Sequence, residues 1–145
     1  MLEVARLRVK DVEFARQEIW VRDGKGYKDR VTMLSLALVN PLRERLKRVK
    51  ALHDNERAAG FGAAYLPLAL EKKYPNAAKE WMWQYVFPAS KRSVDPRSGE
   101  KRRHHVQDQA IQHAIKHAVR EASLTKATTP RTLPFVRDAF ATRRL

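Results

Sequence analysis

The chain of 145 residues contains no cysteine. This absence excludes a disulfide scaffold, a thiolate zinc site and a cysteine nucleophile. Apolar residues never continue for the roughly 20 positions that a membrane-spanning helix needs, and the first residues lack the pattern of a secretory signal peptide. The sequence therefore predicts a cytoplasmic protein without a membrane partner.

Acidic residues are scarce. There are 16 Asp and Glu against 30 Lys and Arg, which gives a formal net charge of +14 at pH 7. An excess of this size favours a polyanionic partner. Hydrophobic residues make up 43% of the chain, so its composition is not that of a disordered protein. The length suits one domain or a piece of one.

Hydrophobic periodicity predicts a mainly helical α+β fold with a small antiparallel sheet. Strand-forming residues at 12–21 and 31–34 flank a basic, glycine-containing turn at 23–30, which predicts a β-hairpin. The pattern of residues 1–10 predicts the end of a helix whose basic residues face the solvent.

Further helices are predicted downstream. A helix of about four turns begins at residues 40–41 and ends at the glycines of 60–62, and a second presents an apolar face over residues 111–122. Prolines predict two short helices within residues 66–88. Turn signals predict that residues 91–103 form a loop.

Metal and nucleotide motifs are weak. His113 and His117 have the spacing of two zinc ligands on a helix, but the glutamate of a metalloprotease helix and a third ligand are missing. Gly24 and Gly26 are too close together for a nucleotide-binding loop and precede a strand. We therefore expect no metal and no cofactor.

Several sequence blocks resemble one enzyme family. Residues 7–14 and 21–31 resemble the catalytic domain of tyrosine recombinases, and the closer match is to integron integrases. Residues 66–81, 95–105 and 125–130 support the resemblance. The block at 66–81 is similar to the helical insertion that sets integron integrases apart from other tyrosine recombinases.

The resemblance covers about residues 1–133 and implies a partial, mostly helical catalytic domain with a small sheet. The family exchanges DNA strands through a 3′-phosphotyrosine intermediate, and positioned cations stabilise the phosphate. Lys25 matches the hairpin lysine that acts as general acid toward the leaving hydroxyl. The first catalytic arginine would precede Met1 and the nucleophilic tyrosine would follow Leu145. The resemblance thus implies a truncated domain that is inactive in DNA cleavage alone.

The chain departs from the family pattern near its C-terminus. The family motif reads Pro-His-Thr-Leu-Arg-His-Ser-Phe-Ala-Thr-His, whereas residues 130–142 read Pro-Arg-Thr-Leu-Pro-Phe-Val-Arg-Asp-Ala-Phe-Ala-Thr. Three inserted residues would leave Arg137 as a displaced second catalytic arginine. Alternatively, loss of two bases converts codons for Leu-Arg-His-Ser-Phe-Ala-Thr-His into codons for Leu-Pro-Phe-Val-Arg-Asp-Ala. One event then explains seven residues, so we favour a frameshift and expect an out-of-frame tail at 134–145.

Candidate DNA contacts come from basic and aromatic side chains. A charged turn is usually only solvated and an aromatic cluster is usually core, but the resemblance favours contacts to phosphates and stacking on extrahelical bases of a folded single strand. The candidates are Arg22, Lys28, Arg30, Trp81, Trp83, Arg97, Arg102, Arg103, His104 and His105.

Three functions remain open at this stage. The chain is a DNA-binding remnant of an integron-type recombinase, an active strand-exchange enzyme, or an inert product of a decayed gene that associates with an intact recombinase subunit. The missing nucleophile and first arginine favour the remnant.

Overall fold

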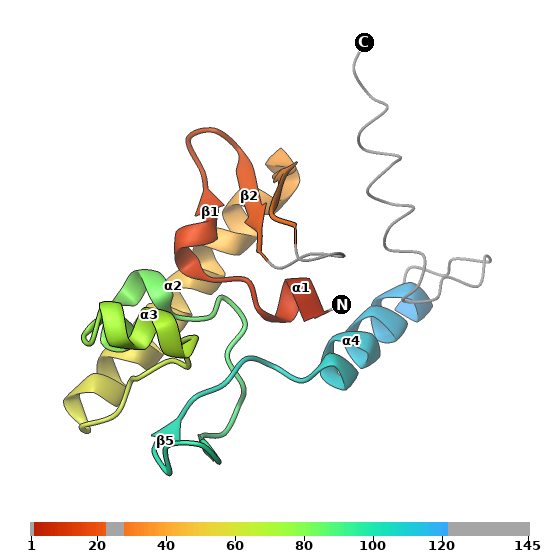
Figure 1. The fold of residues 1–145 in the computed structure, drawn as a ribbon. Helices are drawn as coiled ribbons and strands as arrows, with labels where there is room; N and C mark the ends of the chain where they lie inside the picture. Colours follow the sequence, from red (N-terminus) through yellow and green to blue (C-terminus); the bar gives the residue numbers. More distant parts are fainter. Residues whose placement is uncertain (1, 23–27, 122–145) are drawn as a thin grey trace. The chain divides into compact units, whose positions relative to one another are not determined.

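The computed structural model describes residues 2–22 and 28–121. They fall into two compact units, Leu2–Val106 and a second unit that begins at Gln107. The first unit is the α+β fold that the sequence predicts, with helices and a small antiparallel sheet (Figure 1). Within the described residues, no helix combines the length and apolar character that crossing a membrane requires.

The sheet of the first unit has three short antiparallel strands in the order β1-β2-β3. They are β1 (Val12–Glu13), β2 (Glu18–Val21) and β3 (Arg30–Met33). Trp20 of β2 pairs with Val31 of β3. This pairing confirms the predicted hairpin. The tip of the hairpin, with Lys25, lies outside the described residues.

The N-terminal segment is less helical than the sequence pattern suggested. Helix α1 covers only Leu2–Ala5, and a 3₁₀ turn, η1, covers Val9–Asp11. Between them the chain is extended, because Leu7 and Val9 form backbone hydrogen bonds with the segment 84–86. Ala5 and Leu7 are buried.

Helix α2 (Leu36–Ala58) is longer than predicted. It begins after Ser35 rather than at Asn40, so the prediction that Pro41 opens the helix was wrong. Pro41 lies at the sixth helical position, where its missing N–H removes one hydrogen bond. The helix is anchored further along, where the side chains of Val49 and His53 are buried.

The end of α2 matches the prediction. The amide of Gly60 donates to Arg57 O (3.0 Å) and that of Phe61 donates to Glu56 O (2.8 Å). This pair of hydrogen bonds is a Schellman motif, and Gly60 supplies the positive φ of +83° that the motif needs. The chain is thereby turned back along the helix.

Residues 63–83 form a small core of their own. Helix α3 (Leu68–Lys73) and the 3₁₀ turns η2 (Ala77–Lys79) and η3 (Trp81–Trp83) follow one another, in agreement with the predicted short helices. Leu66, Ala77 and Ala78 are buried together, and Trp83 packs against them. The packing of Trp83 against this core holds η3 next to residues 8–10.

Residues 91–103 were predicted as a loop, but they contain a second hairpin. Strands β4 (Ser93–Val94) and β5 (Lys101–Arg102) pair in antiparallel fashion, and Gly99 takes a φ of +70° in the turn. The turn that joins the strands, with Asp95 and Gly99, agrees with the turn signals of this segment. The strands were missed because two residues, Ser-Val in β4 and Lys-Arg in β5, are too few to show an alternating hydrophobic pattern.

The second unit contains the predicted amphipathic helix, α4 (Asp108–Glu121). His117 Nδ1 of this helix lies 3.4 Å from Glu121. No group of three or more metal-ligating side chains occurs in the part of the chain that the structure describes. Arg137 and the tail at 134–145 lie outside that part.

Candidate nucleic-acid interface

Arg8 holds three distant segments of the first unit together. Its Nη1 donates to Trp83 O (2.5 Å) and its Nη2 donates to Tyr65 O (2.8 Å). Nη2 also lies 3.3 Å from the hydroxyl of Tyr85. The planar guanidinium suits this task because its donors diverge in fixed directions. Arg8 thereby sets the spacing of the surrounding aromatic side chains.

Backbone pairing places Arg8 at this point. Arg8 and Tyr85 form an isolated antiparallel bridge, with hydrogen bonds from Val9 N to Gln84 O (3.0 Å) and from Val86 N to Leu7 O (2.9 Å). The Arg8 side chain therefore lies over the Tyr85 ring, 4.6 Å from its centroid. This contact is a cation–π interaction.

Two tyrosines and two histidines form an aromatic group beside Arg8. We name Tyr65, Tyr85, His104 and His105 the His–Tyr cluster. The ring centroids of His104 and His105 are 4.2 Å apart, and that of Tyr85 is 5.7 Å from His104 and 5.4 Å from His105. Tyr65 lies 6.0 Å from His104. The four rings come from segments up to 40 positions apart.

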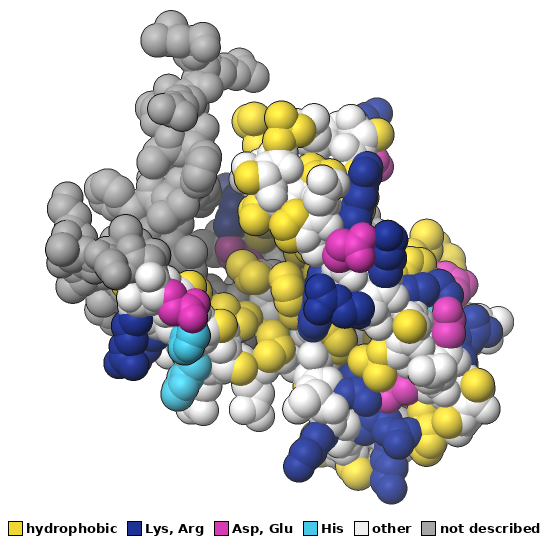
Figure 2. Space-filling view, turned by 180° about the vertical axis from the view of Figure 1, so that it is seen from behind, with side chains coloured by type: hydrophobic (Ala, Val, Ile, Leu, Met, Phe, Trp, Pro, Cys, Tyr) yellow, Lys and Arg dark blue, Asp and Glu magenta, His cyan; other side chains and the backbone are white. Residues whose placement is uncertain are grey.

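Cations border the His–Tyr cluster. The guanidinium of Arg97 lies over the Tyr65 ring, 4.3 Å from its centroid. Arg6 is exposed, and its charge lowers the pKa of His104. Elsewhere on the molecule, Figure 2 shows a face on which Lys and Arg side chains clearly outnumber acidic ones. Flat rings beside positive charge are the combination that binds bases and phosphates.

Local electrostatics disfavour a charge on His104 and on Tyr85. Desolvation lowers the pKa of His104, and the positive charges of His105, Arg6 and Arg8 lower it further, although part of the residue is exposed. Desolvation likewise raises the pKa of the buried Tyr85 phenol. Both shifts favour the uncharged form of the ring, which is the form that stacks on a base without a charge of its own.

Trp83 extends this surface and Trp81 does not. Lys10 Nζ lies 3.3 Å from the centroid of a Trp83 ring, and desolvation lowers the pKa of Lys10. Trp81 instead lies 6.0 Å from the ring of His53, close to Lys50 of α2. Of the two predicted stacking tryptophans, the structure thus brings only Trp83 next to Arg8.

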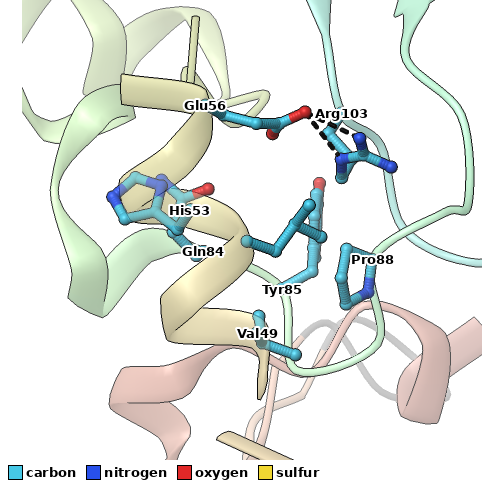
Figure 3. A pocket seen from close by; sticks show the side chains of 8 residues that line it. Val49, His53, Glu56, Gln84, Tyr85, Pro88 and Arg103 are labelled. Carbon is cyan, nitrogen blue, oxygen red and sulfur yellow. Dashed lines mark hydrogen bonds and ion pairs between the residues drawn. The ribbon is translucent and has the colours of Figure 1, made fainter. Parts of the chain in front are cut away.

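The two arginines before the histidines are engaged inside the protein. Arg102 is 6% exposed and pairs with Glu71 (2.8 Å) and Glu100 (2.7 Å). Arg103 pairs with Glu56 (2.7 Å), as the dashed lines of Figure 3 show. Both guanidinium charges are compensated by carboxylates of the protein, so neither arginine is free to pair with a phosphate.

The hairpin cations have partners as well. Arg22 pairs with Asp11 (3.2 Å) and Asp29 (2.6 Å), and Arg30 pairs with Glu3 (2.5 Å). Lys28 is exposed. The predicted catalytic residues Lys25 and Arg137 lie outside the described residues.

Sequence reasoning missed several members of this surface, namely Arg6, Arg8, Lys10, Tyr65 and Tyr85. The first three were placed on the outer face of a helix. The spacing of Arg6 and Arg8 was the available signal, because residues two positions apart share one face of an extended segment, whereas Lys10 lies in η1. The tyrosines carried no local signal, since only the tertiary fold brings them to the histidines.

Comparison with known proteins identifies the family. The model of the phage integrase family matches residues 1–144. The chain belongs to the phage integrase family. It is 48% identical over 140 residues to an "Integrase/recombinase" of Escherichia coli and equally to one of Pseudomonas aeruginosa. Each match covers 97% of this chain and 41% of the relative. The phage integrase ancestry agrees with the tyrosine-recombinase resemblance, and the chain spans less than half the length of these relatives.

Proposed function

We propose that this chain is a DNA-binding part of an integron-type tyrosine recombinase and that it does not cleave DNA alone. The observation that carries the proposal is the His–Tyr cluster with Arg6, Arg8 and Arg97 at its border. Its ligand is a recombination site whose bases are accessible, as in a folded single strand. No cofactor is needed for this binding.

The interface binds through two kinds of contact. Exposed Arg6 and Arg97 face the phosphates, which supply most of the affinity and make it depend on salt. The rings of His104 and His105 stack on an unpaired base, and such stacking contributes about 1–3 kcal/mol per base. Half-buried Arg8 keeps the rings in place.

The integron type rests on residues 66–81. This block resembles the helical insertion of integron integrases. It includes α3 and η2, and its buried residues pack against Trp83. The insertion therefore supports the Trp83 side of the interface. An ordinary tyrosine recombinase without the insertion would lack this support.

Cleavage by this chain alone is not expected. Its four tyrosines include none after Tyr85. Tyr85 is 4% exposed and desolvation raises its pKa, so its phenol is a poor nucleophile. Tyr65 is a member of the His–Tyr cluster, where Arg97 covers its ring.

Fluorescence anisotropy tests the proposal. We expect a labelled single-stranded hairpin with unpaired bases to bind more tightly than the matching duplex, and the affinity to fall steeply as salt rises. Equal affinity at low and high salt, or a preference for duplex, would reject it. A covalent protein–DNA adduct on the same substrate would show that the chain is an active recombinase instead.

A second candidate function is association with an intact recombinase. Apolar side chains are exposed where β3 meets α2, with Met33 at 76% and Leu36 at 71%. Such surface favours contact with another protein. Co-purification with a full-length relative, and its loss in the variant Met33→Glu, would support this function.

A further inference from the structure

Arg103 occupies a built site between α2 and the segment before β4. Its side chain is 14% exposed, and that of its partner Glu56 is 11% exposed. Nε and Nη2 both donate to Glu56 Oε1, at 3.0 Å and 2.7 Å. Nη1 donates to the carbonyl oxygens of Ala89 (2.5 Å) and Ser90 (2.7 Å). One guanidinium thus ties the chain at residue 103 to two other segments.

The tied segments are those that carry the histidines. Residues 87–89 and 104–106 run side by side, with hydrogen bonds from Ala89 N to His104 O and from Val106 N to Phe87 O, both 2.8 Å. Pro88 and His105 form an isolated bridge between them. Tyr85 and Pro88 lie beside Arg103 and Glu56 in Figure 3. Movement of Arg103 would therefore displace His104 and His105.

We infer that Arg103, held by Glu56, is a positioning residue for the His–Tyr cluster and not a phosphate contact. This inference rests on the proposed function, since the histidines matter only if the cluster binds DNA. Rigid placement of stacking groups raises affinity because less order has to be imposed on binding. The guanidinium is needed for this role, since a lysine cannot bond Glu56 and two carbonyls in fixed directions.

The variant Glu56→Gln distinguishes a positioning role of Arg103 from a direct contact between Arg103 and a phosphate. A phosphate-contacting Arg103 would be released by this change, and the loss of one negative charge would further favour DNA. A positioning Arg103 would lose its anchor, and binding would weaken. Arg103→Gln and Arg103→Lys should weaken binding in the same way.

The experiment measures DNA affinity over a salt series for these variants. We expect binding weaker by on the order of tenfold, with the slope of log affinity against log salt unchanged. Loss of a phosphate contact would instead lower that slope by roughly 0.7–0.9. Arg102→Gln is the matched control, because it removes the ion pairs of the neighbouring arginine with Glu71 and Glu100, and the side chain of Arg102 is also buried. Its affinity should stay near that of the parent chain.

Amide hydrogen exchange gives a readout that is independent of DNA. Exchange at Ala89 and Val106 should rise in Glu56→Gln and Arg103→Gln and not in Arg102→Gln. Unchanged exchange, tighter binding by Glu56→Gln, or a reduced salt slope would overturn the inference. If the parent chain binds no DNA, the proposed function fails, and the exchange result still decides whether Arg103 orders this strand. If Arg103→Gln does not fold, Arg103→Lys and Glu56→Gln decide the question.

Discussion

The guanidinium of Arg8 lies 4.6 Å from the centroid of the Tyr85 ring, and the same side chain reaches the hydroxyl of that tyrosine at 3.3 Å. Arg8 also donates to two backbone carbonyls, at Tyr65 and Trp83. Arg8 is thus the residue that connects the aromatic side chains of this surface, although nothing in the basic sequence distinguishes it from the other arginines.

Replacing Arg8 by lysine should destabilise the first unit. Lysine keeps the charge but cannot bond both carbonyls at once, so we expect a loss of about 2 kcal/mol in the free energy of unfolding. Urea unfolding followed by tryptophan fluorescence measures it. Arg16→Lys, at an exposed residue, is the control. Equal stability of the two variants would contradict the role given to Arg8.

Replacing Arg6 or Arg97 by glutamine should weaken DNA binding and flatten its salt dependence. Each change removes one cation at the border of the His–Tyr cluster, so the slope of log affinity against log salt should fall by roughly 0.7–0.9. An anisotropy titration at several salt concentrations gives the slope. Lys72→Gln, on the exposed face of α3, should leave it unchanged. If both variants keep the salt slope of the parent chain, Arg6 and Arg97 do not contact the phosphates.

Acid should destabilise the fold through His53. This residue of α2 is 4% exposed, and desolvation lowers its pKa, with the charges of Arg57 and Lys50 lowering it further against Asp54. His53 therefore binds a proton more readily in the unfolded chain than in the folded chain. Stability is present above the unfolded-state pKa of about 6.5 and falls as pH drops below it.

Melting temperature measured between pH 8 and pH 5 tests this expectation. His53→Phe keeps a ring next to Trp81 and removes the titration, so its melting curve should depend less on pH over this range. The same dependence in parent and variant would show that another group is responsible.

Gly62→Ala should cost more stability than Gly60→Ala. Both glycines have a positive φ, +94° and +83°, so both substitutions strain the backbone. Only at Gly62 would the new Cβ also collide, 2.9 Å from Arg57 Cγ. We expect the free energy of unfolding, measured by chemical denaturation, to be lower by about 1 kcal/mol in Gly62→Ala than in Gly60→Ala. Equal losses would mean that Arg57 moves aside freely.

The sequence predicted most helices of the fold because their signals are local. The end of α2 at Gly60 follows from the need for positive φ, and α4 follows from the spacing of Ile111 and Ile115. The start of α2 was misjudged because Pro41 fits a first-turn position by rule, while packing further along the helix sustains an earlier start. Propensity is a weak guide where tertiary packing decides.

The site was predictable only in part for a similar reason. His104, His105 and Trp83 were named from the family resemblance, and they do lie around Arg8 and Tyr85. Charge alone cannot say which arginine faces solvent. Arg102 and Arg103 were expected at DNA, yet acidic partners 31 and 47 positions away along the chain bind them inside the protein. Such long-range pairing leaves no pattern in the sequence.

The most direct test of the proposed interface is the binding of two hairpin DNAs, one with an unpaired base in its stem and one fully paired. Parent chain and the double variant His104→Ala/His105→Ala are compared by anisotropy at fixed salt. We predict that the parent chain prefers the hairpin with the unpaired base and that the double variant binds both equally. A double variant that keeps the full preference would contradict the assignment of base recognition to the His–Tyr cluster.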